Sequence, residues 1–225
     1  MSPIPADVVI AIDGPSGSGK SSTSRGVASR LGLRYLDTGA MFRAMTWWML
    51  EHGVDVHDQA AVAEHAGKGD IVSGNDPLAP TIVVDGTDVA EAIRSEAVTG
   101  SVSPVSVVPA VRTRLLELQR AVIGAGGIVV EGRDIGSVVA PDAQVKVYLT
   151  ADPAARAARR AAEEGGSDVA ATEQSLLARD RIDSSRATAP LLMADGAHHI
   201  DTTAYTLEEV IDQVVALAEA VEAVQ

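Results

Sequence analysis

A glycine-rich motif near the N-terminus has the residue types and spacing needed to hold phosphate groups. Residues 14–21 match the pattern G-x-x-x-x-G-K-[ST] at every fixed position. In this pattern the glycines let backbone N–H groups surround phosphate oxygens, Lys20 adds a positive charge, and Ser21 is placed to ligate Mg²⁺. We therefore expect ATP and Mg²⁺ to bind at Gly14, Pro15, Ser16, Gly17, Ser18, Gly19, Lys20, Ser21 and Ser22.

The sequence on either side of this motif supports that interpretation. An apolar, β-branched run at 8–12 predicts a buried strand before the motif, and the pattern at 20–31 predicts a helix after it. The alternative is a glycine- and serine-rich turn that happens to precede a helix. Since switches, motors and metabolic kinases share the motif, it does not identify the reaction. The single asparagine, Asn75, is followed by Asp76, so the Asn-Lys-x-Asp motif of GTP-binding switches is absent.

Arginines gather where phosphoryl transfer would need them. Moving a phosphoryl group onto a second anion requires clustered cations, because charge spreads over the transferred group. Arg133 follows the apolar run 128–130, so it is expected at the carboxyl edge of a sheet, where open α/β sheets bind ligands. For any one arginine the alternative is a solvated surface charge. The other candidates are Arg43, Arg156, Arg159 and Arg160, and the group Arg179, Asp183 and Arg186, whose spacing places them on one helix face.

Glu131 ends the same apolar run and has two interpretations. As a carboxylate near Ser21 it would hold Mg²⁺, directly or through water, and otherwise it is only the polar end of a strand. We favour the metal site formed by Ser21 and Glu131.

The elements that must position these residues alternate between strand and helix. Strands are predicted at 8–12, 34–36, 128–130, 145–149 and 199–200, with helices at 20–31, 39–51, 110–123, 153–164, 172–184 and 206–221. This alternation indicates an α/β protein with the P-loop NTPase fold, in which a five-stranded parallel sheet carries helices on both faces. The segment 69–89 interrupts it, and Asp85-Gly86 between apolar residues predicts a small antiparallel insert.

Composition limits the class of protein further. The 225 residues, 46% of them hydrophobic, suffice for one α/β core with small inserts, and the net charge of −13 argues against a nucleic-acid coat protein. Without cysteine there is no disulfide, thiolate zinc site or cysteine nucleophile. No apolar run approaches the ~18 residues of a membrane helix, and no export signal begins the chain. We expect a cytoplasmic monomer that does not bind nucleic acid or membrane.

Four collinear motifs make the sequence resemble the bacterial cytidylate kinase family over essentially its whole length. They are residues 12–20, residues 37–43 (Asp-Thr-Gly-Ala-Met-Phe-Arg), residues 131–139 (Glu-Gly-Arg-Asp-Ile-Gly-Ser-Val-Val) and residues 186–191 (Arg-Ala-Thr-Ala-Pro-Leu), together with the insert at about 69–95. The resemblance implies transfer of the γ-phosphate of ATP to CMP or dCMP. It also implies a core of residues 1–37, 104–152 and 187–225, an acceptor-binding region 38–103 and a lid with its flanking helix at 153–186.

The resemblance also implies a role for each candidate residue. Thr38, Arg43, Arg133 and Arg186 would bind the acceptor phosphate, Ser103, Arg112 and Asp134 would read cytosine, and Arg179 and Asp183 would contact the sugar. Arg156, Arg159 and Arg160 would form a short lid over the ATP phosphates, so that the catalytic cations are Lys20, Arg133, Arg156, Arg160 and Arg186. The alternatives are a kinase for another small acceptor, such as UMP, dTMP, shikimate or gluconate, and a non-enzymatic nucleotide sensor.

Overall fold

The computed structural model describes residues 4–163, 166, 168–186 and 189–221. In chain order its elements are β1 (Val9–Asp13), α1 (Lys20–Leu31), β2 (Arg34–Asp37), α2 (Thr38–Glu51), α3 (Gln59–His65), β3 (Ile71–Ser73), β4 (Ile82–Val84), β5 (Thr87–Asp88), the 3₁₀ turn η1 (Ala92–Arg94), α4 (Glu96–Ser106), α5 (Pro109–Ile123), β6 (Ile128–Gly132), the π-helical turn η2 (Ile135–Val139), β7 (Val145–Thr150), α6 (Pro153–Glu163), α7 (Val169–Ser185), β8 (His198–Asp201) and α8 (Leu207–Glu219).

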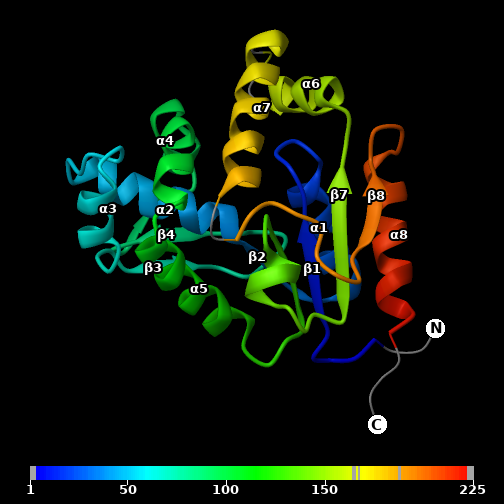
Figure 1. Ribbon diagram of the computed structural model, residues 1–225. Helices are drawn as coiled ribbons and strands as arrows, with labels where there is room; N and C mark the ends of the chain where they lie inside the picture. The colour runs from blue at the N-terminus through cyan, green and yellow to red at the C-terminus, as the bar shows by residue number, and fades with distance from the viewer. Residues whose placement is uncertain (1–3, 164–165, 167, 187–188, 222–225) are drawn as a thin grey trace.

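Five strands form one parallel sheet in the order β2-β6-β1-β7-β8. β1 lies at its centre, where Ile12 pairs with Glu131 of β6 and with Val147 of β7. Because all five strands run the same way, their carboxyl ends share one edge, which is where such sheets bind ligands. Figure 1 shows α6 and α7 above this edge. The predicted five-stranded parallel sheet is confirmed.

The two faces of the sheet are covered by different parts of the chain. Along β1, the side chains of Ile10 and Ile12 pack with α1 and α8, whereas Ala11 between them belongs to the apolar cluster formed by α2, α4, α5 and the insert. This alternation is expected for a strand, whose successive side chains point to opposite faces. It explains why β1 and β6 are apolar over 9–12 and 128–130, since both faces of these strands are buried.

The insert is a three-stranded antiparallel sheet in the order β3-β4-β5, as predicted. Its β4–β5 turn uses Asp85 and Gly86 with φ of 48° and 80°, the left-handed conformations that tight hairpin turns require. The Asp85 carboxylate also accepts a hydrogen bond of 2.8 Å from Nε1 of Trp48 on α2. One residue therefore both turns the hairpin and docks the insert on α2.

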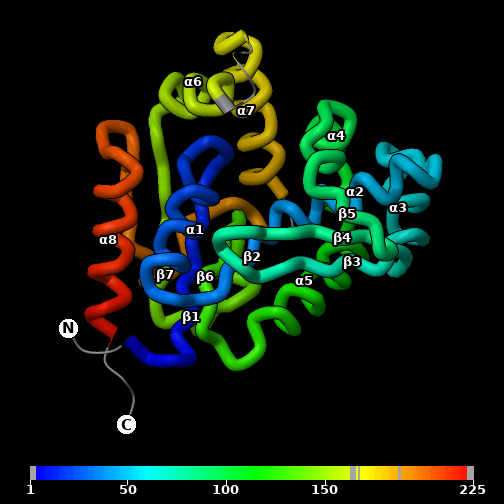
Figure 2. Tube along the Cα trace, turned by 180° about the vertical axis from the view of Figure 1, so that it is seen from behind, coloured from blue at the N-terminus to red at the C-terminus, as the bar shows by residue number. Residues whose placement is uncertain are grey.

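The connection between β3 and β4 reaches back to the main sheet, as Figure 2 shows. The Tyr35 N–H of edge strand β2 donates to the Asn75 carbonyl at 2.9 Å, and Arg25 of α1 donates to the Pro77 carbonyl at 2.8 Å. The first bond satisfies a backbone group on the exposed edge of β2, and the second ties the same connection to α1.

Two helices, α3 and α4, were not expected from the sequence. α4 contains Gly100 and Pro104, both of which argue against a helix. Pro104 cannot donate a hydrogen bond to the Gly100 carbonyl, but Gly100 is exposed, so water can satisfy that carbonyl. Packing of the apolar side chains Val98, Val102 and Val105 outweighs the poor local propensity. None of the helices in the described part of the chain has the length and apolar character needed to cross a bilayer.

Candidate active site

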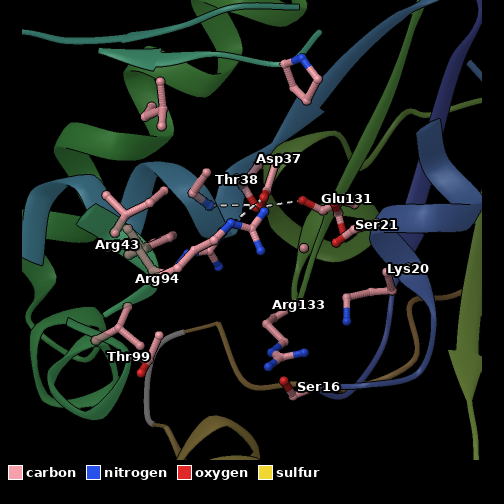
Figure 3. Close-up of a pocket in the computed structure, with 18 of the residues that line it drawn as sticks. Ser16, Lys20, Ser21, Asp37, Thr38, Arg43, Arg94, Thr99, Glu131 and Arg133 are labelled. Carbon is pink, nitrogen blue, oxygen red and sulfur yellow. Dashed lines mark hydrogen bonds and ion pairs between the residues drawn. The ribbon is translucent and has the colours of Figure 1, made fainter. Parts of the chain in front are cut away.

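A cavity of about 410 Å³ opens at the carboxyl edge of the sheet, between the phosphate-binding loop, the insert and α7. Figure 3 shows Ser16, Lys20 and Arg133 on one side of it and Arg43, Arg94 and Thr99 on the other. Although the chain carries a net charge of −13, eight cationic and only four acidic side chains line the cavity. The cations are Lys20, Arg25, Arg43, Arg94, Arg133, Arg160, Arg179 and Arg186, and the acids are Asp37, Glu131, Asp134 and Asp183.

The phosphate-binding loop has the backbone conformation that its glycines predict. Gly14, Gly17 and Gly19 have φ of 147°, 77° and 88°, and a Cβ on Gly14 would lie 2.1 Å from the Leu149 carbonyl oxygen. Gly19 is the N-cap of α1, so the positive end of the helix dipole faces the loop. The Lys20 ammonium donates to the Pro15 carbonyl at 2.7 Å, and burial, reinforced by Arg133, lowers its pKa to about 7.

Ser21 and Glu131 meet at the start of α1. The Ser21 hydroxyl donates to Oε2 of Glu131 at 3.0 Å, and burial together with the nearby Asp37 raises the pKa of Glu131 to about 7. A hydroxyl and carboxylates are the hard oxygen ligands that Mg²⁺ prefers, and this ion is usually held by one or two protein groups plus phosphates and water. The described residues contain no cluster of three acidic or histidine ligands. The donor set at Ser21 and Glu131 fits a magnesium ion shared with a nucleotide.

Arg133 links the loop to α7, which crosses above the cavity. Its Nη1 donates to the Gly14 carbonyl at 2.6 Å, and its Nε donates to Asp183 of α7 at 2.8 Å. Arg186 lies 3.6 Å from the second oxygen of the same carboxylate. Asp183 therefore holds two of the predicted site arginines together at the edge of the cavity.

Three arginines of the cavity retain unsatisfied hydrogen-bonding capacity. The buried Nε atoms of Arg43, Arg179 and Arg186 find no partner within the part of the chain that the structure describes. Burial, together with the neighbouring charge of Arg133, lowers the pKa of Arg179 to about 10. Buried donors without partners and cations crowded against one another are both costly, and an anion relieves both. The cavity therefore has both the charge and the free donors to bind anions.

A buried ion pair of a different kind lies beside the cavity. Arg112 donates to Asp134, and the two side chains are only 10% and 8% exposed. Arg112 also donates to the Ser106 carbonyl at 3.3 Å and lies over the Phe42 ring, 5.4 Å from its centroid. Ser103 and Asp134 face the cavity, while Arg112 stands behind Asp134 and fixes it. This arrangement offers a hydroxyl and a carboxylate to a ligand of the size of a base.

The predicted lid arginines point in different directions. Arg160 lines the cavity. Arg156 is buried, where it donates to the Ser16 carbonyl at 3.0 Å and pairs with Asp180 of α7. Arg159 donates to the hydroxyl and carbonyl of Thr202 at 2.9 and 2.7 Å, beyond the carboxyl end of β8 and outside the cavity lining. A lid role for Arg156 and Arg159 stays a prediction.

Most of the predicted residues come together in this cavity. Those that line it are Ser16, Gly17, Gly19, Lys20, Ser21, Ser22, Thr38, Arg43, Ser103, Glu131, Arg133, Asp134, Arg160, Arg179, Asp183 and Arg186. Gly14, Pro15 and Ser18 shape the loop from behind, and Ala187 and Thr188 of the fourth motif lie outside the described residues.

Sequence reasoning gave no site role to several residues that line the cavity. Asp37 could have been found, because it ends a predicted strand as Glu131 does, and its carboxylate caps α2 and pairs with Arg43 at 3.1 Å. Arg25 follows Ser21 by four residues and so shares its face of α1. Arg94 and Tyr35 carry no comparable signal, since Arg94 closes the insert and Tyr35 lies within the short edge strand β2.

Comparison with known proteins gives a consistent result. The family model described as cytidylate kinase matches residues 10–220. Cytidylate kinase of Streptomyces avermitilis is 60% identical over 218 residues, covering 96% of this chain and 94% of that protein, and cytidylate kinase of Mycobacterium leprae is 50% identical over 210 residues, covering 91% and 92%. A solved structure of an uncharacterized protein from Eubacterium ventriosum shares the fold, with a TM-score of 0.52 at 11% identity over 96% of this chain and all of that one. By its family match and these relatives, the chain belongs to the cytidylate kinase family.

Proposed function

We propose that this protein transfers the γ-phosphate of ATP to CMP or dCMP, giving ADP and CDP or dCDP. The observation that carries the proposal is that one cavity brings the predicted donor and acceptor residues together. Its lining includes Lys20 of the phosphate-binding loop, the Asp134 carboxylate and seven arginines. Membership of the cytidylate kinase family supports cytidylate as the acceptor.

The reaction needs no side-chain nucleophile, because a phosphate oxygen of the acceptor attacks the γ-phosphorus directly. The protein contributes position and charge. Lys20 and the loop N–H groups hold the donor phosphates, while Arg133, Arg160 and Arg186 lie where charge spreads over the transferred group. A bound Mg²⁺ would neutralise phosphate charge at Ser21 and Glu131. Arg43 and Thr38 hold the acceptor phosphate from the other side.

We further propose that Asp134 and Ser103 read the base and that Arg179 and Asp183 contact the sugar. Cytosine offers an amino donor at N4 beside acceptors at N3 and O2, so a carboxylate suits it better than it suits uracil. Arg112 keeps the Asp134 carboxylate in place through their buried pair.

Different segments of the chain have different roles in this proposal. We propose a P-loop core of residues 1–37, 104–152 and 187–225, an acceptor-binding region at 38–103 and a lid with its flanking helix at 153–186, with Asp134 of the core completing the acceptor site. An acidic chain whose cations gather in one cavity suits nucleotide substrates rather than nucleic acid or an anionic membrane surface, and we place its action in the cytoplasm, as a monomer.

A coupled ADP-release assay over CMP, dCMP, UMP, AMP, dTMP and shikimate tests the proposal. We expect CMP and dCMP to give the highest kcat/KM, and the Lys20→Ala variant, purified in parallel, to measure any contaminating kinase. Preference for another acceptor would replace the proposal with a different small-acceptor kinase. Absence of turnover with all six would favour a non-enzymatic nucleotide sensor.

A further inference from the structure

Tyr35 donates its phenol hydroxyl to Oε1 of Glu131 and lines the cavity, yet it has no part in the reaction outlined above. It lies on β2 and is only 2% exposed, with its ring in the apolar cluster between the sheet, α1 and α8. This tyrosine is almost wholly buried, and its polar end points to a carboxylate of the site. The hydrogen bond between them therefore needs a functional explanation.

The bond completes a chain of three side chains. Glu131 accepts from Tyr35 at one oxygen and from the Ser21 hydroxyl at the other, 3.0 Å away. Because the Ser21 hydroxyl donates its hydrogen bond to Glu131, the lone pairs of its oxygen remain available to a cation. Rotation of the Glu131 carboxylate would break this arrangement, and Tyr35 is the second donor that prevents it.

Tyr35 is itself held rigidly. Its backbone pairs with Val129 of β6 on one side, and its N–H donates to the Asn75 carbonyl of the β3–β4 connection on the other. Figure 2 shows this connection lying across the edge of the main sheet. Burial and the adjacent Glu131 raise the pKa of the phenol, so it stays a donor. The hydroxyl is therefore preorganised before any nucleotide binds.

We propose that Tyr35 is a positioning residue for the donor site, which acts through Glu131 to orient Ser21 toward Mg²⁺. The inference rests on the proposed function, in which Ser21 and Glu131 hold the metal. It adds that the orientation of this pair is set from the edge strand, and that the insert, through Asn75, fixes the strand.

The test compares Tyr35→Phe with Tyr205→Phe, the same substitution at a tyrosine that is 48% exposed and outside the cavity lining. The kinetic readout is kcat and KM for CMP as Mg²⁺ is varied. The binding readout is the rise in melting temperature caused by ATP with Mg²⁺, by ATP with EDTA and by CMP alone, which does not depend on turnover.

For Tyr35→Phe we expect kcat to fall about tenfold at limiting Mg²⁺. This factor corresponds to about 1.4 kcal/mol, close to what one lost hydrogen bond to a charged group costs. KM for CMP should stay within about twofold of the parent, and the part of the ATP-induced melting shift that needs Mg²⁺ should shrink. Tyr205→Phe should match the parent. In a Glu131→Gln background, removal of the Tyr35 hydroxyl should cost much less, because the two residues act together.

An unchanged Mg²⁺ dependence of kcat in Tyr35→Phe would overturn the inference. It would also be overturned if the losses of kcat caused by Tyr35→Phe and Glu131→Gln were additive in the double variant. Loss of the melting shift caused by CMP alone would also overturn it, because the substitution would then disturb the whole cavity rather than Glu131. If the parent itself shows no Mg²⁺-dependent shift or turnover, the proposed function fails instead.

Discussion

Replacing Asp134 by asparagine tests how the protein distinguishes cytosine from uracil. Alanine is unsuitable, because it would leave the buried Arg112 charge without its partner, a change that typically costs 3–5 kcal/mol of stability. Asparagine keeps the shape and an oxygen for Arg112. Since a guanidinium can only donate, the amide oxygen must turn to Arg112 and the amide NH₂ must face the cavity.

The magnitude follows from this orientation. The NH₂ of cytosine would lose a charged acceptor, worth about 1.5–3 kcal/mol, and meet another donor, so kcat/KM for CMP should fall at least roughly tenfold. The O4 atom of uracil would gain a donor in place of a repelling carboxylate, so kcat/KM for UMP should rise by a similar factor. The CMP-to-UMP ratio should therefore drop roughly a hundredfold.

The assay is ADP release with CMP and UMP under identical conditions, with Asp183→Asn as the matched control. Asp183 is a second carboxylate of the same cavity, its side chain is also 8% exposed, and it pairs with Arg133 at 2.8 Å. Because we assign it to the sugar, its substitution should lower kcat/KM for both acceptors alike. An unchanged ratio in Asp134→Asn, or an equal change in Asp183→Asn, would show that the base is read elsewhere.

Three further perturbations probe the loop and the sheet. Lys20→Ala should lower kcat by about 10²-fold or more while the circular dichroism spectrum is unchanged, because transition-state charge loses its partner; near-normal kcat would exclude a catalytic loop. Gly14→Ala should lower the melting temperature and abolish the ATP-induced melting shift, since its Cβ would lie 2.1 Å from the Leu149 carbonyl oxygen; a normal shift would contradict this. Burial raises the pKa of Asp13 to about 6, so the folded state retains the proton longer and this group's contribution to stability falls as pH rises from about 4 to 6. Asp13→Asn should remove that fall. In urea titrations, the free energy of unfolding of the variant minus that of the parent should therefore increase by up to about 3 kcal/mol from pH 4 to pH 7. A difference that does not change with pH would refute the assignment.

Local patterns were sufficient for most of the fold. The helix predicted at 20–31 is α1, and the predicted hairpin at Asp85-Gly86 is the β4–β5 turn. In both cases a signal within a few residues decides the structure, such as a glycine cap or a turn that needs positive φ. α4 was missed because its stability comes from apolar packing against α2 and α5, which overrides an unfavourable proline and glycine.

The candidate site also has a part that local sequence predicted and a part that it did not. The phosphate-binding loop is one continuous segment whose function depends on its own backbone, so its eight-residue pattern predicted both its conformation and its place before α1. The arginines were identified as a set, since phosphoryl transfer needs cations and the ends of parallel strands converge. Their individual partners were not predicted. Arg159, for example, bonds to Thr202, whose hydroxyl in turn bonds to the Ser18 carbonyl of the loop.

The sequence by itself determined the donor loop, the alternating elements, the insert and the residue types of the acceptor site. Only the tertiary structure decided which polar side chains meet: Arg112 with Asp134, Arg133 with Asp183, and Tyr35 with Glu131. The last pair joins residues 96 positions apart. Such contacts depend on strand order and on which face each element buries, and these follow from the packing of the whole chain rather than from any short stretch of it.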